Sequence, residues 1–458
     1  MHKYYLSEIS SFVDGELFGN DKKVSKFSID SRTIKKDDVF ICIKGKSYDG
    51  HNFIKDSLKK ASCIVSSEKI QDIDLKNKSY ILVKDTVVAL HKISEFIRLQ
   101  SKAKFIAITG SNGKTTVKEM LAHVLSGYKI TYTRGNLNNH IGVPLTIFSS
   151  NQDDDYVIVE IGANGLNEIE PLSKIVKPNV AAVTNIGYAH IEGFGTLDNT
   201  AKEKYSIFKH LLSNGTAIIN SDDKYSNIID KKNKIFFGHD QGFRKRILEI
   251  CKNFLFKTSF SFIKKRNQNT FNFSYKKFNK DFSLKLNGDH NFSNAACVIS
   301  IAIALGIRLE DIQNKIETFE SVSSRLKVHE ISNNIKLIDD CYNANPSSFK
   351  AALSFLARND QKKLVLMGDM VELGDKSESF HTEIGEYAKE MGVDEFLSIG
   401  KYSNRASNVF GEDGHHFEDA ESLKSYLNNN LESSSCILIK GSRSAKLEEY
   451  VEFLKTRI

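Results

Sequence analysis

Short apolar segments alternate with amphipathic segments over the first part of the chain. The amphipathic segments include Asn52–Lys60. The apolar segments have the length and composition of buried strands. Three of them predict strands: Val39–Ile43, Cys63–Ser66 and Tyr80–Val83. This pattern indicates a small α/β domain that ends near Asp85 and is followed by a connecting helix over Val87–Gln100.

The middle of the chain opens with a strand, a glycine-containing turn and a helix. The strand is predicted over Phe105–Thr109, and the helix begins near Lys114 because apolar residues then recur at helical spacing. Short β-branched runs predict buried strands of a parallel sheet: Tyr156–Glu160, Val180–Thr184 and Thr216–Asn220. Between Phe254 and Leu286, aromatic and polar residues alternate, which predicts antiparallel hairpins at the domain edge.

From Ser321 onward, strands and helices alternate regularly. The predicted strands are Ile335–Asp339, Leu364–Met367, Glu395–Ile399 and Cys436–Lys440, and each precedes a helix. This order is typical of a doubly wound, Rossmann-like unit. A chain of 458 residues also exceeds what one hydrophobic core usually supports. We therefore expect three α/β domains, over residues 1–86, 87–321 and 322–458.

Composition and charge narrow the class of protein. Hydrophobic residues make up 40% and charged residues 26%, which excludes disorder. The net charge of +7 is a mild bias with a local excess around Arg244–Lys280. A lysine-rich solvated surface explains this bias, and an anionic nucleotide substrate also suits it, so we expect no nucleic acid partner.

The cysteines and the hydropathy pattern indicate a cytoplasmic protein. Six cysteines lie far apart without a CxxC pair, which predicts reduced and mostly buried thiols. The first residues lack the apolar core of a signal peptide, and nowhere do about 18 apolar residues run together. We therefore expect no membrane insertion.

The turn after the predicted strand at Phe105–Thr109 carries the first candidate chemistry. The residues expected to contact a nucleotide are Gly110, Ser111, Asn112, Gly113, Lys114, Thr115 and Thr116. Backbone N–H groups at a helix N-terminus bind phosphate, Lys114 neutralises it, and the Thr115 hydroxyl reaches Mg²⁺. The common phosphate loop has four residues between its glycines, whereas here only Ser111 and Asn112 intervene. A plain strand-to-helix turn is the competing interpretation.

Three further polar residues follow predicted strands of the same sheet. Glu160 ends one strand, Asn185 follows the next, and His190 comes five residues later. Ligands gather at the carboxyl ends of parallel strands, so Glu160 and His190 are candidates to hold Mg²⁺ beside the phosphates. Taken singly, such a glutamate is more often a helix cap and such a histidine a surface group.

The tract T-G-S-N-G-K-T-T resembles the phosphate loop of the Mur ligases and their folylpolyglutamate relatives. The resemblance implies a central P-loop-type ATPase domain and a substrate-binding N-terminal domain. It further implies two Mg²⁺ ions, with a carbamylated Lys204 as a ligand of the second. The implied metal ligands are Thr115, Glu160, His190 and Lys204, and the implied catalytic residues are Lys114, Glu160, His190, Lys204 and Arg325.

The resemblance extends to both ends of the chain. Asn291 and Asn294 lie in a tract like the one that contacts adenine, although a helix cap explains these residues nearly as well. Arg325 matches an arginine that contacts the γ-phosphate. Residues that match contacts to ribose and base are Asp339, Tyr342 and Asn343. Residues that match the UDP-sugar and substrate segments are Ser31, Arg32, Lys44, Asp49, Gly50, Asn138 and Asn139.

Within the family, the chain looks most like the member that adds a dipeptide. Three tracts carry this likeness, Gly135–Pro144, Gly368–Gly374 and Ile439–Ser444, and the D-N-P-R tract of the ligase that adds the third residue is absent. The implied reaction joins D-alanyl-D-alanine to UDP-N-acetylmuramoyl-tripeptide through an acyl phosphate formed from ATP. The product is a peptidoglycan precursor, which cell-wall growth, cell shape and division require.

Other functions remain open at this point. A folylpolyglutamate-type ligase shares the phosphate loop, but the muramoyl-type N-terminal segments argue against it. The paired Mg²⁺ candidates count against a nucleotide-switched binding protein. A nucleic-acid motor is disfavoured because the chain lacks an aromatic-basic stacking pattern. We expect a monomer, assign no role to His140, and interpret residues 244–280 as decoration; the third peptide residue and the base for the amine stay open.

Overall fold

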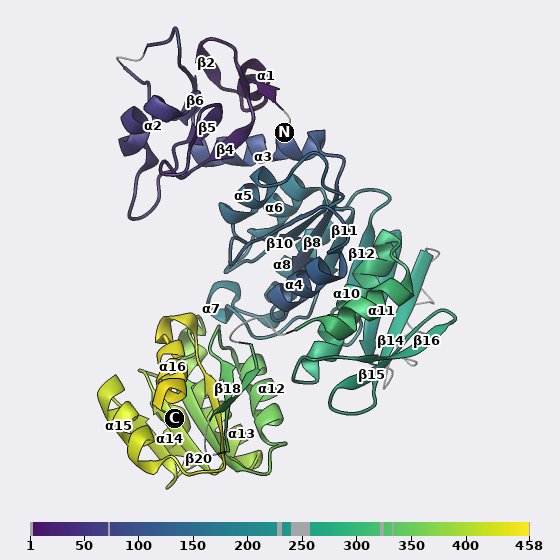
Figure 1. Cartoon of the computed structure of the whole chain (residues 1–458), viewed down its shortest axis with the longest axis vertical. Helices are drawn as coiled ribbons and strands as arrows, with labels where there is room; N and C mark the ends of the chain where they lie inside the picture. The colour runs from purple at the N-terminus through teal and green to yellow at the C-terminus, as the bar shows by residue number, and fades with distance from the viewer. Residues whose placement is uncertain are drawn as a thin grey trace.

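The computed structural model describes residues 3–71, 74–226, 231–239, 257–320, 325–331 and 334–457. Its main sheets follow one another along the chain, from the N-terminal unit at the top of Figure 1 to the C-terminal unit at the bottom. This arrangement confirms the predicted α/β class. Among the described helices, none is long and apolar enough to cross a membrane.

The N-terminal sheet is small and mostly parallel. Its strands lie in the order β2 (Glu16–Gly19), β7 (Ser79–Leu82), β6 (Cys63–Ser66), β5 (Asp38–Ile41) and β4 (Lys26–Ser28). Only the β2–β7 pair within this sheet is antiparallel. The remaining elements are β1 (Tyr4–Tyr5), β3 (Lys23–Val24), α1 (Leu6–Phe12), η1 (Gly50–Phe53) and α2 (Ile54–Lys60).

The central sheet carries the glycine-containing turn. Its strands lie in the order β16 (Phe278–Ser283), β15 (Thr270–Tyr275), β14 (Lys257–Lys265), β13 (Asn233–His239), β12 (Thr216–Asn220), β11 (Val180–Val183), β8 (Lys104–Thr109), β10 (Tyr156–Glu160) and β9 (Ile130–Tyr132). The strands from β9 to β14 pair in parallel. Their carboxyl ends therefore lie along one edge of the sheet, as the sequence predicted.

Helices cover both faces of the central sheet because strand side chains alternate between faces. Phe105 and Ala107 of β8 face one hydrophobic cluster, and Ile106 and Ile108 face the other. The first face is covered by α3 (Thr86–Gln100), α5 (Gly142–Phe148), α6 (Ile169–Val176), α8 (Leu197–Tyr205) and η2 (Ser206–Phe208). The second is covered by α4 (Lys114–Val124), α10 (His290–Leu305) and α11 (Leu309–Thr318).

The sequence suggested that residues 244–280 are decoration. This interpretation is wrong for residues 257–280, the part of the segment that the structure describes. Strands β14, β15 and β16 form the expected antiparallel hairpins, but β14 also pairs in parallel with β13. Phe271, Phe273 and Phe282 from these strands are fully buried against α10. The hairpins therefore complete the core of the central sheet. Residues 244–256 lie outside the described residues.

The C-terminal sheet is the predicted Rossmann-like unit. Its strands lie in the order β17 (Lys327–Ile331), β18 (Ile335–Asp340), β22 (Ser435–Lys440), β19 (Lys362–Gly368), β20 (Glu395–Ile399) and β21 (Gly414–Phe417), and only β17 pairs antiparallel. One face is covered by α12 (Pro346–Leu356), α13 (Ser377–Glu390) and α14 (Asn404–Phe410), and η4 (Gly374–Lys376) precedes α13. The other is covered by α15 (Ala420–Asn430), η5 (Arg443–Ala445) and α16 (Glu448–Arg457).

The predicted state of the cysteines holds for those in the described ranges. Cys42, Cys63, Cys297, Cys341 and Cys436 are free and buried. Burial raises the pKa of the Cys42 thiol to about 12, so this thiol stays protonated and unreactive at neutral pH. Cys251 lies outside the described residues.

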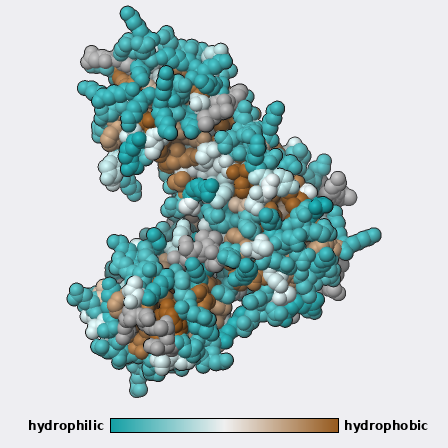
Figure 2. Space-filling view, in the orientation of Figure 1, coloured by the Kyte–Doolittle hydropathy of each residue, from teal (hydrophilic) through white to brown (hydrophobic). Residues whose placement is uncertain are grey.

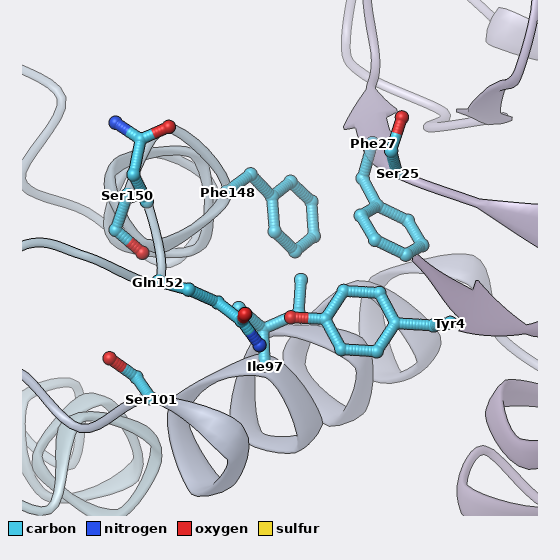
Figure 3. A pocket seen from close by; sticks show the side chains of 9 residues that line it. Tyr4, Ser25, Phe27, Ile97, Ser101, Phe148, Ser150 and Gln152 are labelled. Atoms are coloured by element: carbon cyan, nitrogen blue, oxygen red, sulfur yellow. The ribbon is translucent and has the colours of Figure 1, made fainter. Parts of the chain in front are cut away.

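The N-terminal and central units share one hydrophobic cluster. Residues of α1 and β5 pack with α3 and with the α5 and α6 face of the central sheet. Figure 3 shows a small cavity at this junction, where Tyr4, Phe27, Ile97 and Phe148 meet. Its volume of about 30 Å³ has room for little more than a water molecule, so it is not a substrate site.

We propose domain boundaries near residues 86 and 321. Asp85 begins α3 by accepting hydrogen bonds from the N–H groups of Val87 and Val88. This helix follows the last strand of the N-terminal sheet and precedes the first strand of the central one. Residue 321 lies outside the described residues, between α11 and β17.

Arg98 joins α3 to the central sheet. Its guanidinium donates hydrogen bonds to the carbonyls of Val176, at 2.7 Å, and Lys177, at 2.8 Å, at the C-terminus of α6. It also lies over the Phe105 ring, 4.1 Å from the centroid. A buried cation at a helix C-terminus satisfies carbonyls that have no partner within the helix.

We expect Arg98→Ala to destabilise the protein by roughly 2 to 3 kcal/mol, because it leaves two buried carbonyls without charged donors. The measurement is urea unfolding followed by circular dichroism. Lys102→Ala, an exposed position close in sequence, is the control and should change stability by less than about 0.5 kcal/mol. An unfolding midpoint that Arg98→Ala leaves unchanged would contradict this role.

Candidate active site

The loop between β8 and α4 requires glycine at two positions. Gly110 has a φ of 147°, and a Cβ there would lie 1.9 Å from Thr184 Oγ1. Gly113 has a φ of 80°, and a Cβ there would lie 2.3 Å from Asn294 Oδ1. Both conformations are costly for other residues. The glycines thus let the loop fold tightly into the N-terminus of α4, where N–H groups can receive an anion.

Neighbouring strand ends hold the loop in place. The Asn185 side chain accepts a hydrogen bond from Asn112 N at 3.0 Å and donates one to Asn112 O at 3.0 Å. Thr184 Oγ1 donates to the same carbonyl at 2.5 Å, and Ser111 N donates to the Asn185 carbonyl at 2.9 Å. Asn185, predicted only as a residue at a strand end, therefore fixes the loop backbone.

Lys114 folds back over the loop. Its Nζ donates to the carbonyl of Gly110 at 2.7 Å and to that of Ser111 at 3.3 Å. Desolvation lowers the pKa of Lys114, the Glu160 carboxylate opposes this shift, and the Arg325 guanidinium adds to it. Two cations from different domains thus lie close enough to interact. An anion between them would relieve their repulsion.

Thr115 and Glu160, each a candidate Mg²⁺ ligand from the sequence, contact each other. Thr115 Oγ1 donates to Glu160 Oε1 at 3.3 Å, and Asn138 Nδ2 donates to the same oxygen at 2.8 Å. Glu160 is only 2% exposed, and its Oε2 has no hydrogen-bond partner among the described residues. A buried carboxylate oxygen with unused lone pairs fits a hard cation such as Mg²⁺.

His190 contacts the C-terminal unit rather than Thr115 or Glu160. Its Nδ1 lies against the Glu372 carboxylate of the C-terminal unit, and this contact is the main cause of the lowered pKa of Glu372. Within the described ranges, no three histidine, cysteine or carboxylate side chains converge on one point. A complete ligand set is therefore not assembled from these residue types alone.

Lys204, on α8, is almost fully buried at 1% exposure. Burial lowers its pKa to about 7, and the nearby Lys114 contributes further. Its Nζ lies 5.0 Å from the Phe194 ring centroid. Lys202, two residues earlier, is exposed, so burial and Lys114 account for the lowered pKa of Lys204. A lysine that is partly neutral at pH 7 has a free amine lone pair, which can attack the carbon of carbon dioxide.

The adenine candidates use their side chains within the protein. Asn291 Nδ2 donates to the Asn287 carbonyl at 2.6 Å, and Asn294 Nδ2 donates to Asn291 Oδ1 at 2.8 Å. Asn294 also packs against Gly113, as the blocked Cβ position shows. These asparagines therefore support the phosphate loop from α10.

The C-terminal candidates lie at the carboxyl end of β18. Arg325 lies over the Tyr342 ring, 4.2 Å from the centroid. Asp339 is buried and accepts a hydrogen bond from Cys341 N at 3.2 Å, while Asn343 Oδ1 accepts one from Ala344 N at 2.9 Å. Ser324, next to Arg325, lies outside the described residues.

The N-terminal substrate candidates occupy two loops. Arg32 and Lys44 have exposed side chains that pair with acidic neighbours, Arg32 with Asp30 at 2.8 Å and Lys44 with Asp49 at 3.6 Å. Ser31 lies in the first loop. Gly50 ends the second, where a Cβ would lie 2.7 Å from Ile43 N. Two exposed cations here can contact an anionic substrate.

Asn138 and Asn139 lie in the central unit, away from these loops in sequence. Asn138 contacts Glu160, and Asn139 Oδ1 accepts hydrogen bonds from Ile141 N and Gly142 N at the start of α5. Part of their hydrogen-bonding capacity is thus used to position the carboxylate and the helix.

Sequence reasoning missed several residues that the fold brings to the site. Asn345 Nδ2 donates to Asn112 Oδ1 at 2.7 Å and so joins the C-terminal unit to the phosphate loop. Its signal was present, since Asn-Pro at 345–346 marks a helix N-cap. Lys118 lies 3.9 Å from Glu160 Oε2. No pattern distinguished Lys118 or Glu372 from surface residues.

Comparison with known proteins identifies the family. The family model of the Mur ligase middle domain matches residues 108–302. The model of the Mur ligase glutamate ligase domain matches residues 324–443, and that of the Mur ligase family catalytic domain matches residues 23–110. These matches cover most of the chain.

Curated relatives and solved structures agree with these matches. The chain is 35% identical to the UDP-N-acetylmuramoyl-tripeptide–D-alanyl-D-alanine ligase of Escherichia coli, over 98% of each chain. It is 36% identical to the ligase of the same name from Buchnera aphidicola subsp. Acyrthosiphon pisum, over 98% of this chain and 97% of the relative.

Among solved structures, MurF from Acinetobacter baumannii superposes with a TM-score of 0.87 at 29% identity, covering 100% of this chain and 99% of the other. MurF ligase from Thermotoga maritima, solved in complex with ADP, superposes with a TM-score of 0.78 at 26% identity, covering 94% of this chain and 97% of the other. The chain belongs to the Mur ligase family.

Proposed function

We propose that this protein joins D-alanyl-D-alanine to UDP-N-acetylmuramoyl-tripeptide at the expense of ATP, which gives the pentapeptide precursor of peptidoglycan. The observation that carries the proposal is the phosphate loop, which has Lys114 folded over it and is held by Asn345 of the C-terminal domain, whose Arg325 interacts with the Lys114 charge. The full-length likeness to ligases of this name supports the choice of substrates.

The reaction has to activate a carboxylate, because an amine does not displace hydroxide from a free acid at useful rates. In this proposal the terminal carboxylate of the tripeptide attacks the γ-phosphate of ATP, which releases ADP and leaves an acyl phosphate. The amine of D-alanyl-D-alanine then attacks the acyl carbon, and phosphate departs. Lys114 and Arg325 stabilise the negative charge that develops on the transferred phosphoryl oxygens.

The contacts of the described residues support nucleotide binding by both the central and the C-terminal domain. The loop N–H groups and Lys114 hold the phosphates from the central domain, whereas Arg325 and Tyr342 approach from the C-terminal domain. The Asn112–Asn345 hydrogen bond links the phosphate loop of the central domain to the C-terminal domain. We propose that Asp339, Tyr342 and Asn343 lie near the ribose and base, with Asn291 and Asn294 supporting the adenine side.

Thr115, Glu160, His190 and a carbamylated Lys204 are the residues that would hold two Mg²⁺ ions. Bound there, the ions would supply positive charge beside the transferred phosphoryl group. The unpartnered Glu160 Oε2 and the lowered pKa of Lys204 fit this role, since carbamylation converts a repelled ammonium into an anionic oxygen ligand. His190 would have to exchange its contact with Glu372 for a metal.

The substrate's UDP-sugar is proposed to bind the N-terminal domain through Ser31, Arg32, Lys44, Asp49 and Gly50, with Asn138 and Asn139 near its peptide. Figure 2 shows the molecule hollowed on one side, between the N-terminal and C-terminal domains. A substrate held at the N-terminal domain would reach the phosphates across this hollow. We propose that the enzyme acts as a cytoplasmic monomer and that its substrate carries either diaminopimelate or lysine as third residue.

Measurement of ADP release with a coupled assay tests the substrate assignment. We expect turnover only with ATP, UDP-N-acetylmuramoyl-tripeptide and D-alanyl-D-alanine together, and none with folate plus glutamate. Lys114→Ala should abolish ADP release without changing the circular dichroism spectrum, because the terminal phosphates lose their cation. Rapid ATP hydrolysis without the UDP-substrate would contradict the proposal.

The carbamate on Lys204 makes a second prediction. Lys204→Ala should lose nearly all activity, and acetate or formate at high concentration should restore part of it by supplying a carboxylate oxygen in the vacated space. Lys202→Ala is the matched control and should keep most activity, because its exposed side chain leaves the opposite face of α8. Full activity of Lys204→Ala would rule out the assignment.

The shared nucleotide site predicts that ligands compact the molecule. When both an ATP analogue and UDP-N-acetylmuramoyl-tripeptide are present, contacts on the N-terminal, central and C-terminal domains should draw the hollow closed. Small-angle scattering should then show a smaller radius of gyration than for the free protein, with either ligand alone as control. An unchanged profile with both ligands bound would refute closure.

A further inference from the structure

Lys118 is a fully buried lysine one helical turn beyond Lys114 on α4. Its side chain is 0% exposed, although lysine is almost never buried without a partner. Nζ donates to the Thr133 carbonyl at 2.8 Å and lies 2.9 Å from Glu119 Oε1. The same atom lies 3.9 Å from Glu160 Oε2. The ammonium therefore sits between two carboxylates inside the central domain.

The two oxygens of Glu160 differ in what they contact. Oε1 accepts hydrogen bonds from Asn138 and Thr115, whereas Oε2 has no hydrogen-bond partner among the described residues. The 3.9 Å separation from Lys118 is too long for a hydrogen bond but short enough for a strong charge interaction. Lys118 thus compensates the charge of Glu160 and leaves the lone pairs of Oε2 unused.

Thr133 fixes this geometry from the end of β9. Its carbonyl accepts the hydrogen bond from Lys118, and its hydroxyl accepts one from Glu160 N at 3.0 Å. Thr133 is itself fully buried, and Thr146 Oγ1 donates to its hydroxyl at 3.3 Å. One residue therefore holds both the ammonium and the backbone of the carboxylate.

We propose that Lys118 is an internal counter-ion of Glu160, which holds the carboxylate in place without metal and thereby weakens Mg²⁺ binding at that carboxylate. The inference rests on the proposed assignment of Glu160 as a Mg²⁺ ligand. A buried carboxylate without a cation is strongly unfavourable, so the metal-free site needs a charge of its own. Two cations at one carboxylate repel each other, so the Lys118 ammonium weakens the binding of Mg²⁺ to Glu160.

The role makes Lys118 a positioning residue, because it acts on Glu160 and has no direct contact with the phosphate loop in the described structure. Glu119 and the Thr133 carbonyl hold the ammonium back from Oε2, which leaves that oxygen open to a metal. If Glu119 loses its charge, the ammonium is free to move toward Glu160 and compete more strongly.

The experiment is a titration of Mg²⁺ at saturating ADP, with the unfolding temperature as readout. Lys118→Met should unfold at a lower temperature than wild type without Mg²⁺ and show a larger rise on adding Mg²⁺, and this rise should begin at about tenfold lower Mg²⁺. In the Lys118→Met and Glu160→Gln double variant, this gain should disappear, because the two residues act on the same charge.

Lys234 provides a matched control. It is another almost fully buried lysine of the central sheet, 2% exposed, near the start of β13 and so at the opposite end of the sheet from Glu160. Lys234→Met should lower the unfolding temperature as well, but its rise with Mg²⁺ should equal that of wild type. A larger rise in both lysine variants would show a general response of weakened proteins and overturn the inference.

Glu119→Gln is the second variant, used if Lys118→Met does not fold. Glu119 is partly exposed, so the substitution carries little folding risk, and it should raise about threefold the Mg²⁺ concentration at which the unfolding temperature begins to rise. If the Mg²⁺ dependence is unchanged in both Glu119→Gln and Lys118→Met, the role of Lys118 is overturned, but the metal assignment of Glu160 is not. A wild-type protein with ADP that does not respond to Mg²⁺ overturns the metal assignment of Glu160 as well.

Discussion

The backbone of the loop from Gly110 to Gly113 is the constraint on which the rest of the site depends. Thr184 and Asn185 hold it from the next strand, and Asn345 holds it from the C-terminal domain. These bonds fix carbonyls and side chains that would otherwise turn toward the anion. The N–H groups at the start of α4 are left directed at the phosphate position.

Around this loop the fold buries more positive charge than a core normally tolerates. Lys118 and Lys204 are nearly inaccessible, and the Arg325 guanidinium lowers the pKa of Lys114. Each buried amine costs free energy unless an anion accompanies it. Lys118 has two carboxylates, whereas Lys204 has a lowered pKa and is proposed to gain an anion by carbamylation. An ATP-binding site explains the excess, because triphosphate supplies the missing negative charge.

Polar contacts join the central and C-terminal domains among the described residues. Arg358, just after α12, forms two hydrogen bonds with Asp289, at 2.9 and 2.7 Å, and His190 pairs with Glu372. Ile191 also packs into the C-terminal hydrophobic cluster. By contrast, the N-terminal and central domains share a continuous apolar cluster. Polar contacts exchange partners at little cost, so movement during a catalytic cycle is expected mainly where the interface is polar.

The sequence by itself determined the fold class and the strand–loop–helix at Gly110–Lys114, because both follow from local periodicity, and it placed Glu160 at a strand end beside that loop because the carboxyl ends of parallel strands lie together. The tertiary structure decided what depends on distant chain segments. It placed Asn345 on the loop, turned His190 toward Glu372, buried Phe271 in a sheet where decoration was expected, and enclosed Lys118 beside Glu160. A lysine that faces water and one that faces a buried carboxylate have the same local sequence signal, and only the packing of α4 against β9 and β10 separates them.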